Sequence, residues 1–188
     1  MMLFSQEGCL TVFPATVLDY VYRHSLESMF INIVLQEHPM PMIDVYAPAD
    51  LFPAGSDSEL GDELTRAVLR AEGVASPGPF HLDNTAAFIH RLPASAISTA
   101  STASARTVRV QIVTPPGSLD RDGQRQIVRE ATEIVTRISG DEGQAKRTWV
   151  ILAEAAEGGW GLAGTAFGRE EFGALAARAA AAKATAKR

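Results

Sequence analysis

Two stretches of the chain repeat the order strand, helix, strand, and this repeat constrains the fold more than any other feature. The first repeat opens with MIDVYA (42–47), where polar and apolar residues alternate as in a strand. Its second strand is predicted in HLDNTAAFIHRL (81–92). The second repeat has strands in RTVRVQIV (106–113) and RTWVILAEA (147–155). Each crossover is long enough for parallel pairing, so the sequence predicts two right-handed βαβ units in tandem.

The helices inside the two units carry their own start and stop signals. SDSE, from Ser56 to Glu59, matches a capping box that opens the first helix, and Gly73 ends it. The second helix is predicted from about Asp120 to Ile138, with Gly140 as its stop. The apolar stripes predicted to face the core are Leu60, Leu64, Ala67, Val68 and Ala71 in the first helix, and Ile127, Ala131, Ile134, Val135 and Ile138 in the second.

These elements predict an α/β (α+β) fold in which one four-stranded sheet carries two helices on one face. The opposite face of such a sheet is left uncovered. Since an apolar sheet face must be buried against something, we expect it to contact other subunits in an oligomer.

The amino-acid composition of the chain changes near residue 40. Residues 1–39 contain one alanine and one glycine, whereas the rest is rich in Ala, Gly and Arg. We therefore divide the chain into an extension of doubtful status, 1–39, and a domain, 40–188. Within the domain we expect units at 41–94 and 106–156, then a hairpin and an Ala-rich helix from Arg169. Met40 is either an internal residue or an alternative start of the chain.

Charge and cysteine content exclude several classes of partner and site. The net charge of −5 offers no basic footprint, so we expect neither nucleic acid nor a membrane as partner. The single cysteine excludes an internal disulfide and fits a cytoplasmic protein. The histidines show no zinc-site spacing, and nothing in the sequence calls for a metal or a cofactor.

The motif GWGLAG, from Gly159 to Gly164, has the spacing of a dinucleotide loop but the wrong context. That loop opens the first helix of a βαβ unit and is followed by a later strand with an acidic end. Here the chain is nearly finished. We therefore predict a glycine-rich hairpin that carries Trp160.

Pro41 has two interpretations. As an internal residue it merely begins a strand, where its missing N–H costs little, and the residues alone favour this. As a first residue it would be a secondary amine. Model α-amino groups have a pKa of about 7.7–8.0, and burial or nearby cations would leave such an amine neutral and basic.

With its Met-Pro, alternating strand, two βαβ units and late glycine-aromatic hairpin, the chain resembles the tautomerase superfamily. The likeness is greatest to fused trimeric members related to malonate semialdehyde decarboxylase and cis-3-chloroacrylic acid dehalogenase. It covers about 41–173, and its most specific parts are MPMIDVY and WVILAEAAEGGWGLAGTAFGREEF. The resemblance implies a homotrimer without cofactor, with an active site around an amino-terminal proline, Pro41.

The chain also departs from the family pattern. The turn TPPGS (114–118) lacks the arginines that bind the substrate carboxylate in the dehalogenase and decarboxylase, and the dehalogenase's assisting tyrosine and glutamate fall on Ile151 and Leu162. Asp83 is the nearest candidate for the decarboxylase's assisting aspartate, and Trp160 matches an aromatic pocket residue. The remaining candidates for substrate binding, each equally explicable as a solvated or packed polar group, are His81, Asn84, Arg91 and Arg109.

We therefore expect a tautomerase in which Pro41 acts as general base on a small 2-keto or enol acid, a carboxylate substrate. One alternative is a hydratase or decarboxylase in which cationic Pro41 is the acid and Asp83 orients water. Another is a catalytically silent member with a role in assembly.

Overall fold

The structure is a computed structural model that describes residues 40–168, 170–174 and 177. Its central sheet has the strand order β2-β1-β3-β4. β1 (Met42–Pro48) pairs in parallel with β2 (Ala86–Leu92) and antiparallel with β3 (Val108–Thr114), which pairs in parallel with β4 (Thr148–Glu154). The two strand–helix–strand units are thus confirmed, joined through antiparallel β1 and β3.

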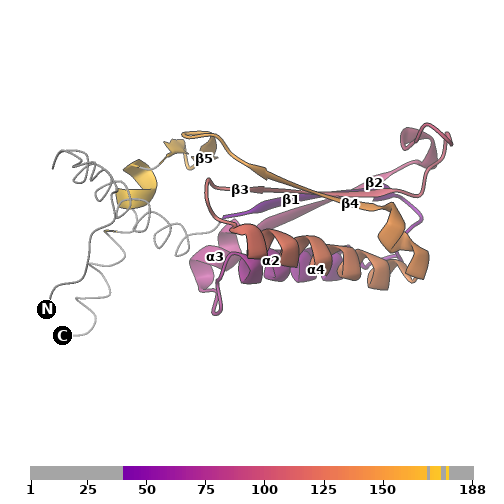
Figure 1. Cartoon of the computed structure of the whole chain (residues 1–188), viewed down its shortest axis with the longest axis horizontal. Coiled ribbons are helices and arrows are strands. Elements are labelled where there is room, and N and C mark those ends of the chain that lie inside the picture. Colours follow the sequence, from indigo (N-terminus) through magenta and orange to yellow (C-terminus); the bar gives the residue numbers. More distant parts are fainter. Residues whose placement is uncertain (1–39, 169, 175–176, 178–188) are drawn as a thin grey trace, which may run out of the picture.

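Two antiparallel helices, α2 (Asp57–Ala71) and α4 (Arg121–Ser139), cover one face of this sheet (Figure 1). The Asp120 carboxylate accepts the Gly123 N–H at 2.7 Å and caps the start of α4. Gly140 ends it with φ of 67°, in the left-handed region that favours glycine.

The predicted capping box at the start of α2 is wrong. The Ser56 hydroxyl turns backwards and donates to the carbonyl of Pro53 at 2.8 Å, and it accepts no helical amide. Glu59 pairs instead with Arg137 of α4 at 3.1 Å. The backbone of Ser56 is already helical, which takes its side chain away from the amides it would cap.

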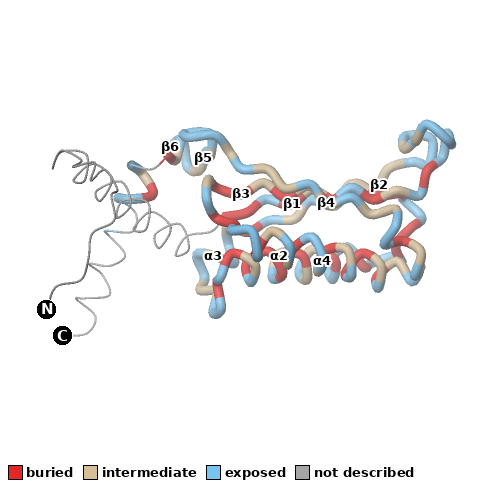
Figure 2. The backbone as a smooth tube through the Cα atoms, viewed as in Figure 1, coloured by how far each residue is buried: buried red, intermediate tan, exposed pale blue. Residues whose placement is uncertain are grey.

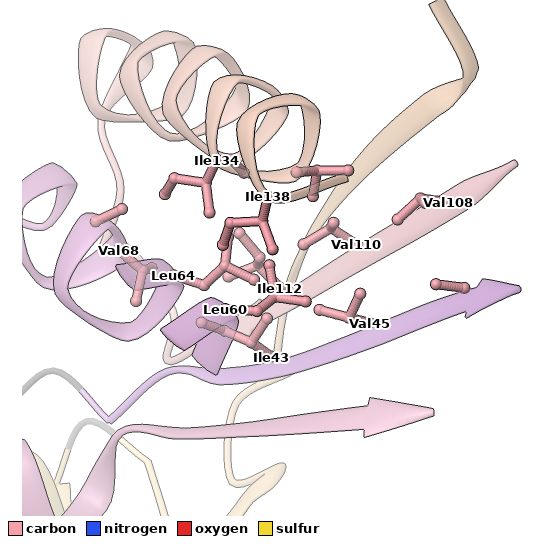
Figure 3. Packing of buried hydrophobic residues seen from close by; sticks show 14 of the residues in the cluster. Ile43, Val45, Leu60, Leu64, Val68, Val108, Val110, Ile112, Ile134 and Ile138 are labelled. Atoms are coloured by element: carbon pink, nitrogen blue, oxygen red, sulfur yellow. The ribbon is translucent and has the colours of Figure 1, made fainter. Parts of the chain in front are cut away.

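The main core lies between the two helices and the sheet. Figure 3 shows Ile43 and Val45 of β1 pointing at the helices, where Leu60 and Leu64 of α2 meet them. Burial alternates along β1 and β3, because only every second side chain faces the helices (Figure 2). All the predicted stripe residues of both helices are buried except Ala71, which packs against the same core.

The opposite face of the sheet is uncovered in the single chain and carries large apolar side chains. They are Met42, Phe88, Trp149 and Ile151, which are 41%, 48%, 56% and 43% exposed. No helix among the described residues is both long and apolar enough to span a membrane.

The predicted strand 81–92 is too long. It begins at Ala86, and a short helix, α3 (Pro79–Asn84), precedes it. Pro79 favours a helix start because its fixed φ suits the first turn, and Gly78 caps it. Short 3₁₀ turns occupy Ala94–Ala96 and Glu142–Arg147.

The predicted glycine-rich hairpin is confirmed as β5 (Trp160–Leu162) and β6 (Thr165–Phe167). Beyond it, residues 170–174 and 177 are helical. The predicted extension, 1–39, and most of the predicted Ala-rich helix lie outside the described residues.

Candidate functional site

Pro41 lies immediately before β1, at one end of the sheet. It is buried, and its carbonyl oxygen accepts the amide N–H of Ala86 at 3.3 Å. Since β1 is a central strand, a proline at its start leaves the pairing intact, as one inside it would not. The nitrogen of Pro41 is bonded to Met40, and as an amide it has no basic lone pair.

The same end of the sheet gathers several loops. β2 begins there and β3 ends there, because Met42 is paired with both Ala86 and Val113. The carbonyl of Thr114 accepts the N–H of Ala155 at 2.9 Å, which holds the ends of β3 and β4 together. Polar groups for this end therefore come from the turn 114–118, from α3 and from the hairpin after β4.

His81 and Asn84 lie in α3 and not on the strand predicted over 81–92. The Nδ1 of His81 accepts the Gly78 N–H at 3.1 Å and caps the helix. The amide of Asn84 donates to the carbonyl of Phe80 at 2.7 Å. Both side chains thus stabilise α3 itself.

Asp83 is exposed in the same short helix. It precedes by three residues Ala86, the amide that bonds Pro41. Figure 1 shows α3 at the end of the sheet where β1 begins. The structure therefore brings Asp83 to the Pro41 end of the sheet.

Trp160 also lies at this end, on β5 of the hairpin (Figure 1). It packs with Leu162 and Phe167 around two buried side chains, Met40 and Phe172, which are 1% and 3% exposed. This cluster is separate from the main core. An aromatic residue was expected near Pro41, whereas the burial of Met40 was not anticipated, because it depends on contacts with residues far along the chain.

The two arginines lie at the other end of the sheet. Arg91 pairs with Ala47 and Arg109 with Tyr46, which places both about 15–20 Å along β1 from Pro41. Arg91 binds the carboxylate of Asp57 at 2.5 Å and donates to the carbonyl of Phe52 at 3.1 Å. Within one chain, neither arginine reaches a substrate held at Pro41.

Arg109 belongs to a row of stacked groups on the uncovered face. Its guanidinium lies 4.3 Å from the ring centroid of Tyr46, whose other neighbour is the ring of His90, stacked at 4.4 Å. The Nε2 of His90 lies 2.7 Å from the Asp44 carboxylate. The alternation of β1 places Asp44 and Tyr46 on this face, a signal that sequence reasoning did not use.

Glu72 is a buried acid at the Pro41 end that sequence reasoning missed. It follows α2 directly, is 2% exposed, and neither carboxylate oxygen has a hydrogen-bond partner. Burial raises the pKa of its carboxyl to about 9. A glutamate at a helix end is ordinarily solvated, so no local pattern indicates this burial. Glu72 is therefore protonated at neutral pH.

Among the described residues, no group of three or more His, Cys, Asp and Glu side chains is arranged to hold a metal ion.

No protein-family model and no curated protein matches the chain. Among solved structures, a fused 4-OT symmetric trimer matches with TM-score 0.58 and 17% identity, over 70% of this chain and 98% of that one. Pt0534 inactivated by 2-oxo-3-pentynoate matches with TM-score 0.57 and 16% identity, over 69% and 97%. N1, of the cis-3-chloroacrylic acid dehalogenase family, matches with 0.54 and 16%, over 71% and 89%.

These matches span nearly the whole of the other chains, and at such identities they concern the fold. They agree with the paired βαβ units, and the likeness read from the sequence is confirmed at that level. The described part of the chain has the fold of the tautomerase superfamily.

Proposed function

We propose that this chain, when it begins at Pro41, is a tautomerase that moves a proton between carbon and oxygen of a small 2-keto or enol acid. The observation that carries the proposal is the position of Pro41. It lies buried at the start of the central strand of a tautomerase fold, beside the cluster that contains Trp160.

The chemistry follows from freeing the nitrogen. A first-residue proline is a secondary amine whose ring fixes its direction, and burial favours its neutral form. A neutral amine near its pKa at neutral pH is a suitable general base, worth typically about 10²–10⁴-fold in rate. The same nitrogen, bonded to Met40, cannot take a proton.

We propose a homotrimer as the working assembly, in the cytoplasm. The uncovered sheet face with Met42, Phe88, Trp149 and Ile151 supports an oligomer, because such a surface is costly to leave in water. The fused 4-OT structures with this fold are trimers.

A hydrolytic version is the second candidate. Asp83 is exposed on α3, three residues from the amide that holds Pro41. In that version a protonated Pro41 is the acid, and Asp83 orients a water toward an unsaturated or keto acid. The base must be neutral and the acid charged, so the two versions have opposite pH dependence.

The test compares the full chain with a chain that begins at Pro41 and with the same short chain carrying Pro41→Ala. Ketonisation of phenylenolpyruvate is followed, and the proteins are treated with 2-oxo-3-pentynoate, which inactivates Pt0534. We expect activity and covalent labelling of Pro41 in the short chain only, with kcat/KM rising with pH to a plateau. The alanine chain keeps a primary amine but lacks the ring, so its activity falls. An inactive, unlabelled short chain that folds would leave the silent, assembling protein as the better description.

A further inference from the structure

The buried side chain of Met40 marks a second property of the site. Met40 is 1% exposed, yet it does not join the core between sheet and helices. It packs instead with Phe172 among the partly buried Trp160, Leu162 and Phe167. These partners all come from the end of the chain, so the segment after β4 folds over the residue that precedes Pro41.

The walls of this cluster are held in place independently of Met40. The rings of Phe167 and Phe172 pack 5.2 Å apart. The N–H of Phe172 donates to the carbonyl of Gly168 at 3.0 Å, and the N–H of Gly168 donates to the Glu171 carboxylate at 2.8 Å. These bonds tie Gly168, directly after β6, to the helical residues 170–174. Removing the Met40 side chain therefore leaves an apolar space with a formed wall.

The position of this space relative to Pro41 is set by covalent geometry. The carbonyl carbon of Met40 is bonded to the Pro41 nitrogen, and its side chain leaves the next atom. In a chain beginning at Pro41, the atom that exchanges a proton lies about 3 Å from the same nitrogen. A group bonded to that atom can then reach the space that the Met40 side chain fills now.

We propose that Met40 is an internal plug: its side chain fills the apolar part of the ligand site, so the full chain is closed to ligand, and the vacated space accepts an apolar substituent. The role given to the ligand rests on the proposed function. The apolar space and the Met40 side chain that fills it do not depend on that function. The buried lining of the space is apolar and aromatic. This apolar space favours a 2-keto acid with an aryl or unbranched alkyl group on C3. A second carboxylate on C3 would be buried there without a charge or hydrogen-bond partner.

The test uses the full chain with Met40→Ala, and Val128→Ala as its control. Val128 is 39% exposed on the outer side of α4, away from the proposed interface, so truncation there opens no space. Binding is measured by calorimetry with phenylpyruvate and oxaloacetate, which differ in carrying a phenyl group or a carboxylate on C3. We expect Met40→Ala to bind phenylpyruvate at least about tenfold more tightly than oxaloacetate, and the wild type and Val128→Ala to bind neither measurably.

Because a cavity can destabilise the protein, two further measurements keep the test decisive. Met40→Val opens a smaller space, with the same expected preference. In the wild-type full chain, hydrogen peroxide should leave Met40 unmodified while the chain is folded and oxidise it once the chain is unfolded in urea, as read by peptide mass spectrometry. Rapid oxidation of Met40 in the folded chain, or binding by Val128→Ala equal to that by Met40→Ala, would overturn the plug.

Neither measurement needs a free amine at Pro41, so the two proposals fail separately. An inactive short chain with a ligand-binding Met40→Ala full chain would refute the tautomerase and keep the plug. An active short chain, with folded Met40→Ala and Met40→Val chains that bind no phenylpyruvate, would do the reverse.

Discussion

Glu72 shows how one residue couples burial to protonation. Glu72 is 2% exposed and its carboxyl has no hydrogen-bond partner, so ionising it in the folded protein is costly. Burial raises its pKa from 4.5 to about 9, and the folded state therefore holds a proton that the unfolded state has released across this range. A group that binds a proton more tightly when folded stabilises the fold at low pH and does so less as pH rises.

We accordingly expect the free energy of unfolding to fall as pH rises from about 4.5 toward about 9, by up to about 1.4 kcal/mol per pH unit from this group. Glu72→Gln has the same shape and no proton to lose, so its stability should lack this slope. Urea unfolding at a series of pH values measures both. The control is Glu133→Gln on the exposed side of α4, which should keep the wild-type slope. A parallel slope in Glu72→Gln would mean that the carboxyl is not the source.

Asp83 separates the two candidate chemistries at the scale of one side chain. It is exposed on α3, which leads into β2 at the Pro41 end of the sheet. Asp83→Asn in the chain that begins at Pro41 should leave ketonisation of phenylenolpyruvate within about threefold, because base catalysis by the amine does not need it. Hydration of an acetylenic acid, if present, should fall by about 10²-fold or more. Asp50→Asn, an exposed aspartate beyond the other end of β1, should change neither rate.

At the scale of elements, periodicity predicted most of the fold. The alternation in 42–47 and the apolar stripes of the two long helices reflect burial against one shared core, which is a strong local signal. α3 was missed because six residues are too few for a helical period to show, and because FIH within 81–92 has strand character. The burial of Met40 and that of Glu72 depend on contacts with other segments of the chain. No local sequence pattern indicates such contacts.

Two glycines in the long helices, Gly123 of α4 and Gly61 of α2, differ in the space around them. A Cβ on Gly123 in the first turn of α4 would lie 2.4 Å from the carbonyl oxygen of Ala71, where α2 ends. Gly61 lies inside α2, and a Cβ there would meet only the Cβ of Ala87 at 3.7 Å, an ordinary contact. The close approach of the helix ends beside the Pro41 end of the sheet thus requires glycine at one position and not at the other.

Gly123→Ala should therefore destabilise the protein by about 1–3 kcal/mol through overpacking, although alanine favours helices. Gly61→Ala should stabilise it by up to about 1 kcal/mol, the difference in helix propensity. Thermal and urea unfolding of both variants give the two signs. A stabilising Gly123→Ala would show that the ends of α2 and α4 lie further apart than 2.4 Å implies.

At the scale of the whole molecule, the two faces of the sheet differ in what covers them. One face is closed by α2 and α4, and the other presents exposed apolar side chains around the Asp44–His90–Tyr46–Arg109 row. A buried neighbour would remove these apolar groups from water, whereas the charged ends of the row would need partners in the interface. The proposed site at Pro41 and the proposed assembly surface thus both involve the same strand, β1.

Ile151 tests which surface assembles the molecule. It is 43% exposed on β4, on the uncovered face, so Ile151→Lys places a charge where the proposed trimer buries an apolar side chain. Val128 is 39% exposed on the outer side of α4, and Val128→Lys makes the same change away from that face. Light scattering after size exclusion should give a trimer for the wild type and Val128→Lys and a monomer for Ile151→Lys, with all three folded by circular dichroism. If Val128→Lys dissociates and Ile151→Lys does not, the helical side of the molecule forms the interface. The uncovered sheet face would then be free in solution, and the stacked row on it would be open to other ligands.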